Sequence, residues 1–181
     1  CDTIGKHMAE DIQDSATAAH GQQVISACAF IHHEFDGVTK VFLPRRAMTK
    51  KFLPGLLELP GGHIDFGEDI VAGLIREVKE ELEMTITVGD PFATFTYVNE
   101  VKGSHSIEVI YFAQFVEPID QIVLRPHDHS EGKWFSEQDV RDNRHLLVPE
   151  AQVTHEHGDD PEYLAILRGF QLLDDKALKF S

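Results

Sequence analysis

One amphipathic helix, predicted between Asp69 and Leu82, constrains the fold of this chain more than any other segment. On a helical wheel with about 100° per residue and Glu77 placed at 0°, its apolar residues fall between roughly 60° and 160°. These residues are Val71, Leu74, Ile75, Val78 and Leu82. Such a stripe has to be buried against other elements, so the helix predicts a packed domain with at least one further layer.

The segments around this helix carry β-strand signals. Residues 22–33 and 38–46 flank Asp36-Gly37, a strong hairpin turn, and a second hairpin joins 92–98 to 105–116 through a polar turn with Gly103. The remaining predicted elements are a short strand broken at Pro60-Gly61-Gly62 and followed by a loop, a strand at 132–135, a helix capped by Ser136, and a final helix that starts at Pro161. This order predicts an α/β fold, with a mixed sheet flanked by helices.

The chain is predicted to hold one domain, residues 22–181, after a flexible N-terminal arm, residues 1–21. The arm mixes small, polar and acidic residues without a period. Met8 is the expected natural start, and a lipid-bearing Cys1 is the alternative. The only other cysteine, Cys28, lies in an apolar strand, which together with the missing leader favours a reducing, cytoplasmic setting.

Charge and composition exclude several function classes. The chain has 31 Asp plus Glu against 16 Lys plus Arg, a net charge of −15, which repels nucleic-acid backbones. No apolar run approaches the roughly 20 residues of a membrane span. With 42% hydrophobic and 26% charged residues, the chain can bury a core and is not disordered. A small molecule is therefore the expected partner, with no nucleic acid and no membrane.

Three carboxylates share the polar face of the predicted helix. Glu80 and Glu81 fall at about 300° and 40°, on either side of Glu77. Like charges at this spacing destabilise a helix by a few tenths of a kcal/mol per pair, so a compensating group is expected. Three oxygen ligands on one rigid face suit Mg²⁺ or Mn²⁺, and Arg76 can orient them by hydrogen bonds. A solvated surface face is the alternative.

From Gly62 the chain reads G-HIDFG-E-DIVAGLI-R-E-V-K-E-E-L-E-M, which resembles the Nudix box, G-x5-E-x7-R-E-U-x-E-E-x-G-U, where U is a bulky aliphatic residue. The residues in register are Gly62, Glu68, Arg76, Glu77, Val78, Glu80, Glu81 and Met84. Glu83 stands where the family has glycine, which would end the helix in the left-handed conformation. We expect the helix to end slightly differently or to continue to Met84. The element order is also similar to the Nudix fold, an α/β/α sandwich around a mixed β-sheet.

The resemblance implies a Nudix pyrophosphohydrolase of the MutT-like type, a metal-dependent hydrolase that cleaves the pyrophosphate linkage of a nucleoside triphosphate or nucleoside diphosphate derivative. It implies Mg²⁺ or Mn²⁺ held by Glu77, Glu80 and Glu81, with the Gly61-Gly62 backbone close to the metal or phosphate. Glu68 and Arg76 would be orienting partners in the catalytic set. Since family members often dimerise, a homodimer is also expected.

The general base has three candidates. Glu131, three residues before Trp134, resembles a common family position for an acidic residue near the metals, and Asp128 and Glu108 are the alternatives. The run His127–His129 is typical of an exposed loop, with catalysis by histidine as the minor interpretation.

Substrate signals are fewer. Arg45, Arg46, Lys50 and Lys51 are expected to bind substrate phosphates or to form a solvated loop. The coenzyme A-type pyrophosphatase subgroup is similar at Arg45, Ala47 and Gly55, but Arg46 and Lys51 depart from it. The proline typical of the ADP-ribose subgroup is Glu100 here, and the tyrosine typical of the diadenosine polyphosphate subgroup is Val101.

Two other function classes remain. A catalytically inactive Nudix-fold nucleotide-binding or regulatory module is disfavoured because Glu77, Glu80 and Glu81 are all present. An isomerase such as isopentenyl diphosphate isomerase would need an additional centre of Cys and Glu. Cys28 is the only interior cysteine candidate, so the sequence favours hydrolysis.

Overall fold

The structure is a computed structural model that describes residues 20–149, 153–154 and 159–179 of the 181-residue chain. Its elements are β1 (Gln23–Phe35), β2 (Val38–Arg46), β3 (Gly61–His63), α1 (Ile70–Leu82), β4 (Ile86–Asn99), β5 (Ser104–Phe115), η2 (Ile119–Gln121), β6 (His129–Phe135), α2 (Glu137–Asp142), η3 (Arg144–Leu146), β7 (Val153–Thr154) and α3 (Pro161–Lys179). The predicted arm, apart from its last two residues, lies outside the described residues.

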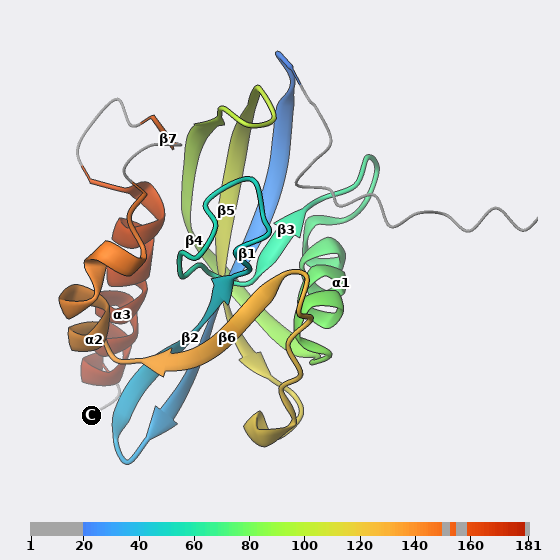
Figure 1. Cartoon of the computed structure of the whole chain (residues 1–181). Helices are drawn as coiled ribbons and strands as arrows, with labels where there is room; N and C mark the ends of the chain where they lie inside the picture. Colours follow the sequence, from blue (N-terminus) through green and yellow to red (C-terminus); the bar gives the residue numbers. More distant parts are fainter. Residues whose placement is uncertain (1–19, 150–152, 155–158, 180–181) are drawn as a thin grey trace, which may run out of the picture.

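The strands form one mixed sheet in the order β6-β2-β1-β5-β4-β7, with β3 paired to β1. The central pair, β1 and β5, is parallel, and every other pair is antiparallel. Helix α1 covers one side of this sheet, while α2 and α3 lie on the other (Figure 1). The predicted α/β/α sandwich with a mixed sheet is confirmed.

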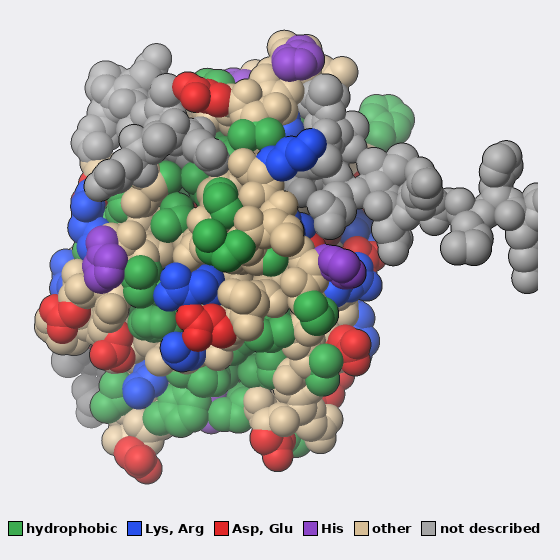
Figure 2. Space-filling view, viewed as in Figure 1, with side chains coloured by type: hydrophobic (Ala, Val, Ile, Leu, Met, Phe, Trp, Pro, Cys, Tyr) green, Lys and Arg blue, Asp and Glu red, His purple; other side chains and the backbone are tan. Residues whose placement is uncertain are grey.

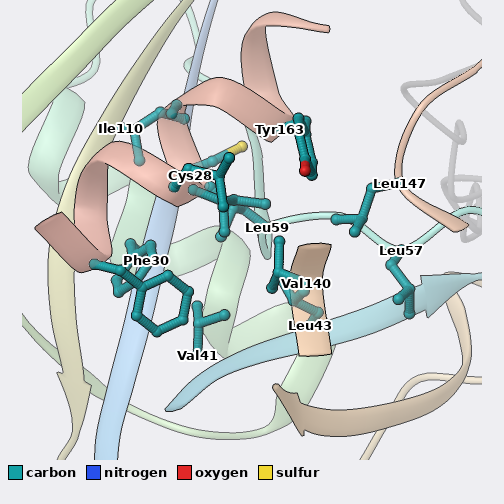
Figure 3. Packing of buried hydrophobic residues seen from close by; sticks show 14 of the residues in the cluster. Cys28, Phe30, Val41, Leu43, Leu57, Leu59, Ile110, Val140, Leu147 and Tyr163 are labelled. Carbon is teal, nitrogen blue, oxygen red and sulfur yellow. The ribbon is translucent and has the colours of Figure 1, made fainter. Parts of the chain in front are cut away.

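Strand β1 divides the interior into two cores because its side chains alternate between the two faces of the sheet. Ala27, Ala29 and Ile31 pack in the core that also holds the apolar stripe of α1. Cys28 and Phe30 point to the opposite face and pack with residues of α3 (Figure 3). This second face of β1 is the one that forms part of the cavity described below.

Helix α1 begins and ends through local hydrogen bonds. Asp69 is its N-cap, and its carboxylate accepts from the N–H groups of Val71 and Ala72. The helix ends at Leu82, and Glu83 takes the left-handed conformation, with φ at 55°. The expectation of an altered helix end is therefore wrong. Glu83 adopts the glycine-like geometry, and Lys79 Nζ supports it by donating to the Glu83 carbonyl at 2.8 Å.

The predicted break at Pro60-Gly61-Gly62 is also corrected, because Gly61 and Gly62 belong to β3. At Gly61, φ is 144°, and a Cβ atom would lie 2.2 Å from the carbonyl oxygen of Ala27. Only glycine lets the chain pair with β1 at this distance. The two residues that look like a turn are thus what allows β3 to join the sheet.

The surface carries charged side chains of both signs (Figure 2). On the face seen in Figure 2, Lys and Arg side chains are scattered among acidic and apolar ones and form no continuous basic surface. Within the described parts of the chain, no helix combines the length and apolar character needed to cross a bilayer.

Candidate functional site

A cavity of about 960 Å³ lies where the Gly-Gly strand, helix α1, the floor of the sheet and the start of α3 meet. Its lining is rich in carboxylates, which include Glu58, Glu77, Glu80, Glu81, Glu108 and Asp128. They come from four separate segments, so the sheet and helix packing creates the acidic character of the cavity.

The three glutamates predicted on one face of α1 all line this cavity. Glu81 is deepest, and its Oε2 accepts a hydrogen bond from the Gly61 N–H at 3.0 Å. Burial, followed by the charge of Glu58, raises the pKa of Glu81 well above its ordinary value. Burial likewise raises the pKa of Glu77, although Arg76 opposes the shift. Glu80 is more exposed, with 47% of its side chain accessible.

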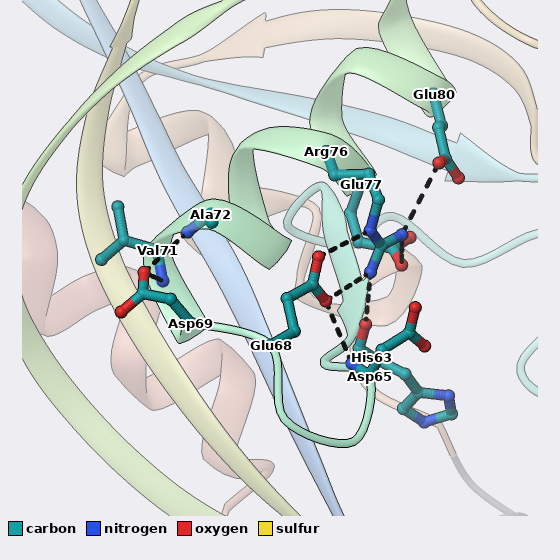
Figure 4. Close-up of polar contacts among 9 residues, drawn as sticks. All are labelled: His63, Asp65, Glu68, Asp69, Val71, Ala72, Arg76, Glu77 and Glu80. Carbon is teal, nitrogen blue, oxygen red and sulfur yellow. Dashed lines mark hydrogen bonds and ion pairs between the residues drawn. The ribbon is translucent and has the colours of Figure 1, made fainter.

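Arg76 organises the outer part of this face (Figure 4). Its guanidinium donates twice to Glu68, at 2.9 Å each, and once to Glu77 at 2.6 Å. It also donates to the His63 carbonyl at 3.1 Å and lies 3.6 Å from Glu80. The hydrogen bonds from Arg76 lower the pKa of Glu68 to about 2, so this carboxylate is a permanent anchor for Arg76. Glu68 itself does not line the cavity.

Gly62 brings β3 against α1. A Cβ atom at this position would lie 2.6 Å from Glu77 Oε2, so any larger residue would displace that carboxylate. Both Gly61 and Gly62 line the cavity, next to Glu77 and Glu81. The backbone is therefore as close to the carboxylates as the sequence pattern predicts.

The floor of the cavity holds Cys28, Tyr97 and Glu108 from three adjacent strands. The Cys28 thiol and the Tyr97 hydroxyl both lie beside Glu108. Burial, followed by the charge of Glu58, raises the pKa of Glu108 to about 7. Burial also raises the pKa of Cys28 well above its ordinary value. No centre of Cys and Glu is evident from the sequence, but the fold brings Cys28 and Glu108 together.

The predicted basic residues separate into two groups. Arg46 and Lys50 line the cavity, where Arg46 donates to Glu58 at 2.6 Å and Lys50 to Asp128 at 2.5 Å. Lys51 is exposed and does not line the cavity. Although burial opposes it, Arg46 together with His129 lowers the pKa of Glu58, so Glu58 stays ionised.

Arg45 and Glu131 lie elsewhere. They are cross-strand neighbours in β2 and β6, and Arg45 Nε donates to Glu131 Oε1 at 2.6 Å. Lys133 is a second partner of Glu131 at 2.9 Å. Neither Arg45 nor Glu131 lines the cavity, because the pleat and a register shift after Arg45 turn only Arg46 inward. Both therefore lie outside the cavity that the box carboxylates line.

The histidine run is split by the fold. His129 is 2% exposed, opens β6 and contacts Glu58 through Nε2 at 2.9 Å, so the expected exposed loop is wrong at this position. His127 and Asp128 precede the strand and line the cavity.

Several residues that line the cavity were not predicted from the sequence. Asp160 and Glu162 flank Pro161 at the start of α3, where the sequence signals only a helix start, yet both line the cavity. Lys102 lies in the turn between β4 and β5, and its Nζ is 3.1 Å from His63 Nδ1. Burial, followed by the charge of Lys102, lowers the pKa of His63 to about 4, so the ring is neutral. No sequence spacing relates these residues to the Nudix box.

The donor chemistry of this wall fits a hard divalent cation. Among the residues that the structure describes, no three His, Cys, Asp or Glu side chains are already gathered as a metal cluster. Glu77 and Glu81 nevertheless offer carboxylate oxygens beside glycine backbone, and burial raises the pKa of both. A divalent cation bound there would favour their ionised form.

Replacing Glu108 by glutamine should raise the free energy of unfolding near pH 8 and leave it unchanged near pH 4. The folded pKa of about 7 lies above the ordinary 4.5, so ionisation of Glu108 destabilises the fold as the pH rises through this window. Because glutamine cannot ionise, the variant does not lose this part of the free energy of unfolding as the pH rises. Urea unfolding of the metal-free protein at both pH values measures the difference. The exposed variant Glu83→Gln should follow the wild type, and an equal Glu108→Gln effect at both pH values would contradict the assignment.

Comparison with known protein families gives a match to the NUDIX domain model over residues 23–157. Among curated proteins, Nudix hydrolase YfcD of Escherichia coli strain K12 is 41% identical over 59 residues. That alignment covers 32% of this chain and 31% of YfcD, so the chain matches less than a third of its relative.

Solved structures are similar over a longer stretch. The Ap4A hydrolase of C. elegans, in a binary complex, has a TM-score of 0.63 and 25% identity, covering 84% of this chain and 98% of that chain. The MutT protein of Methanosarcina mazei Go1 has a TM-score of 0.61 and 22% identity, covering 84% and 96%. The second likeness concerns the fold alone.

Proposed function

The chain belongs to the NUDIX domain family, and from this membership we propose that it is a metal-dependent hydrolase that cleaves the pyrophosphate linkage of a nucleoside triphosphate or nucleoside diphosphate derivative. One observation carries the proposal: Glu77, Glu80 and Glu81 of the box line a single cavity, together with Gly61 and Gly62. The Ap4A hydrolase neighbour supports a nucleotide as the substrate class.

In this proposal, Glu77, Glu80 and Glu81 hold Mg²⁺ or Mn²⁺, with the Gly62 backbone alongside. The bound ion would neutralise phosphate charge and lower the pKa of an attacking water. Arg76 keeps Glu77 oriented, and Glu68 fixes Arg76 in turn. Arg46 and Lys50 supply positive charge on the opposite wall. Pyrophosphate cleavage depends mainly on such positioning and charge neutralisation, and not on covalent catalysis.

The proposed general base is one of the candidate residues that face the cavity. Asp128 and Glu108 both do so, unlike Glu131. Asp128 stays paired with Lys50 at 2.5 Å, whereas Glu108 has a pKa of about 7 and can take up a proton near neutral pH. Glu108 is therefore the better base of the two.

A nucleotide library screen with phosphate release as the readout tests this function. We expect hydrolysis of at least one nucleoside triphosphate or diphosphate derivative in the presence of Mg²⁺ or Mn²⁺. Glu77→Gln serves as the inactive reference, and Glu83→Gln as a matched active one. Nucleotide binding without any turnover would instead support an inactive binding module, and a coenzyme A substrate would select that subgroup.

A second candidate function is the isomerisation of a diphosphate-bearing substrate, which the Cys28–Tyr97–Glu108 cluster favours. The pKa of Cys28 is raised and that of Glu108 is about 7, so the pair can hold a proton and accept one within the same cavity. Cys28→Ala separates the two functions. A hydrolase should keep its turnover within about threefold, since no hydrolytic step needs the thiol, whereas proton transfer to carbon by Cys28 should cease.

The proposal also includes a cytoplasmic setting and a homodimer. A reducing compartment suits Cys28, which is a free buried thiol in the described part of the chain. Light scattering of the purified protein would check the dimer.

A further inference from the structure

Lys102 is a lysine in an unusual place. Lys102 is 3% exposed, a burial that is rare for lysine. It lies in the turn between β4 and β5 and lines the same cavity as the box carboxylates. The position therefore needs an explanation beyond a surface turn.

The turn is built to hold this side chain inward. Asn99 Oδ1 accepts from the Lys102 N–H at 3.0 Å, and the Asn99 carbonyl accepts from the Gly103 N–H at 2.8 Å. Asn99 is 5% exposed and also lines the cavity. A side chain that bonds its own turn in this way fixes the backbone from which Lys102 projects.

The ammonium of Lys102 reaches β3. Its Nζ lies 3.1 Å from His63 Nδ1, one residue after Gly62, where an added Cβ atom would clash with Glu77. A long side chain from one end of the sheet is thus brought beside the Gly-Gly segment. An anion seated against that segment would lie within reach of Lys102.

Two further cations face the same cavity from different segments, Arg46 at the end of β2 and Lys50 in the following loop. Burial and then the charges of Arg46 and Lys50 lower the pKa of Lys102 to about 8, so the three cations repel one another. Arg46 and Lys50 each keep a carboxylate partner, Glu58 and Asp128, and several positive groups gathered in one cavity are typical of a site for a multiply charged anion.

We propose that Lys102 binds a phosphoryl group of the substrate, with Asn99 as the residue that positions it, and that Arg46 and Lys50 complete a cationic site for the diphosphate opposite the box carboxylates. This inference rests on the proposed function for the identity of the anion. Its contacts come from the β4–β5 turn, which lies outside the Nudix box.

Calorimetric titration of the full chain with inorganic pyrophosphate in the presence of Mg²⁺ tests the site directly. Lys102→Met should raise the dissociation constant for pyrophosphate at least about tenfold, the loss of affinity expected for one charged hydrogen bond to phosphate. Lys102→Arg keeps the charge and should stay within about threefold of the wild type. Lys51→Met removes an exposed lysine that does not line the cavity, so it is the matched control and should not change binding.

The role of Asn99 is tested by a double-mutant cycle. Asn99→Ala should weaken pyrophosphate binding, but Asn99→Ala combined with Lys102→Met should bind no more weakly than Lys102→Met alone, because Asn99 acts through Lys102. Thermal unfolding checks that each variant is folded, and Lys102→Gln replaces Lys102→Met if the latter is not.

Unchanged pyrophosphate binding in folded Lys102→Met, or a wild type that binds no pyrophosphate, would overturn the inference. The proposed function fails differently. A wild type that binds pyrophosphate through Lys102 but hydrolyses no nucleotide would refute the hydrolase and leave the anion site intact.

Discussion

Glu80→Gln should lower kcat by at least about a hundredfold while leaving the fold unchanged. The substitution removes one negative oxygen ligand from the proposed metal site but keeps the size of the side chain. Because 47% of the Glu80 side chain is exposed, the free energy of unfolding should change by less than about 0.5 kcal/mol. Steady-state kinetics on the nucleotide identified by the screen, together with urea unfolding, measure both quantities.

The matched control for this experiment is Glu83→Gln. Glu83 lies three residues further along, is exposed and does not line the cavity, so its turnover should match the wild type. Equal turnover in the Glu80→Gln variant and the wild type would remove Glu80 from the catalytic set. A loss in both variants would point to helix destabilisation in place of lost ligation.

Removing divalent ions should abolish turnover completely, and Mg²⁺ or Mn²⁺ should restore it. Burial raises the pKa values of Glu77 and Glu81, and the negative charges of other carboxylates add to both shifts, so a bound cation would favour the ionised, ligating form of this wall. Full activity after exhaustive chelation would be incompatible with a metal-dependent hydrolase.

Metal binding should also be visible without any substrate. An ion that binds the folded chain stabilises it, by about 2.7 kcal/mol at a hundred times its dissociation constant. The midpoint of thermal unfolding should therefore rise with added Mg²⁺ in the wild type, and rise less in Glu81→Gln. An identical rise in both proteins would place the ion elsewhere.

Local patterns in the sequence were enough to predict α1 and the carboxylates on its polar face. The period of the apolar residues fixes which side of the helix is buried, and the same period places Glu77, Glu80 and Glu81 together on the other side. The turn at Asp36-Gly37 likewise identified the β1–β2 hairpin. These features depend on residues close together in the chain, so propensity and spacing are sufficient.

The choice between neighbouring residues was beyond the sequence. Arg45 and Arg46 look alike as phosphate ligands, yet only Arg46 faces the cavity, because the pleat and the register shift of β2 turn Arg45 towards Glu131. Glu131 likewise resembled a base by position along the chain. Pleat direction is set by the partner strand, which lies far away in sequence.

By itself, the sequence determined the helix, its acidic face and the family, since these depend on short spacings along one element. Only the tertiary structure decided what faces those carboxylates. It brought Cys28 against Glu108 and Lys102 against His63, pairs that are 80 and 39 residues apart. Such contacts arise from strand order and register, which are fixed by the packing of the whole sheet and not by any local pattern.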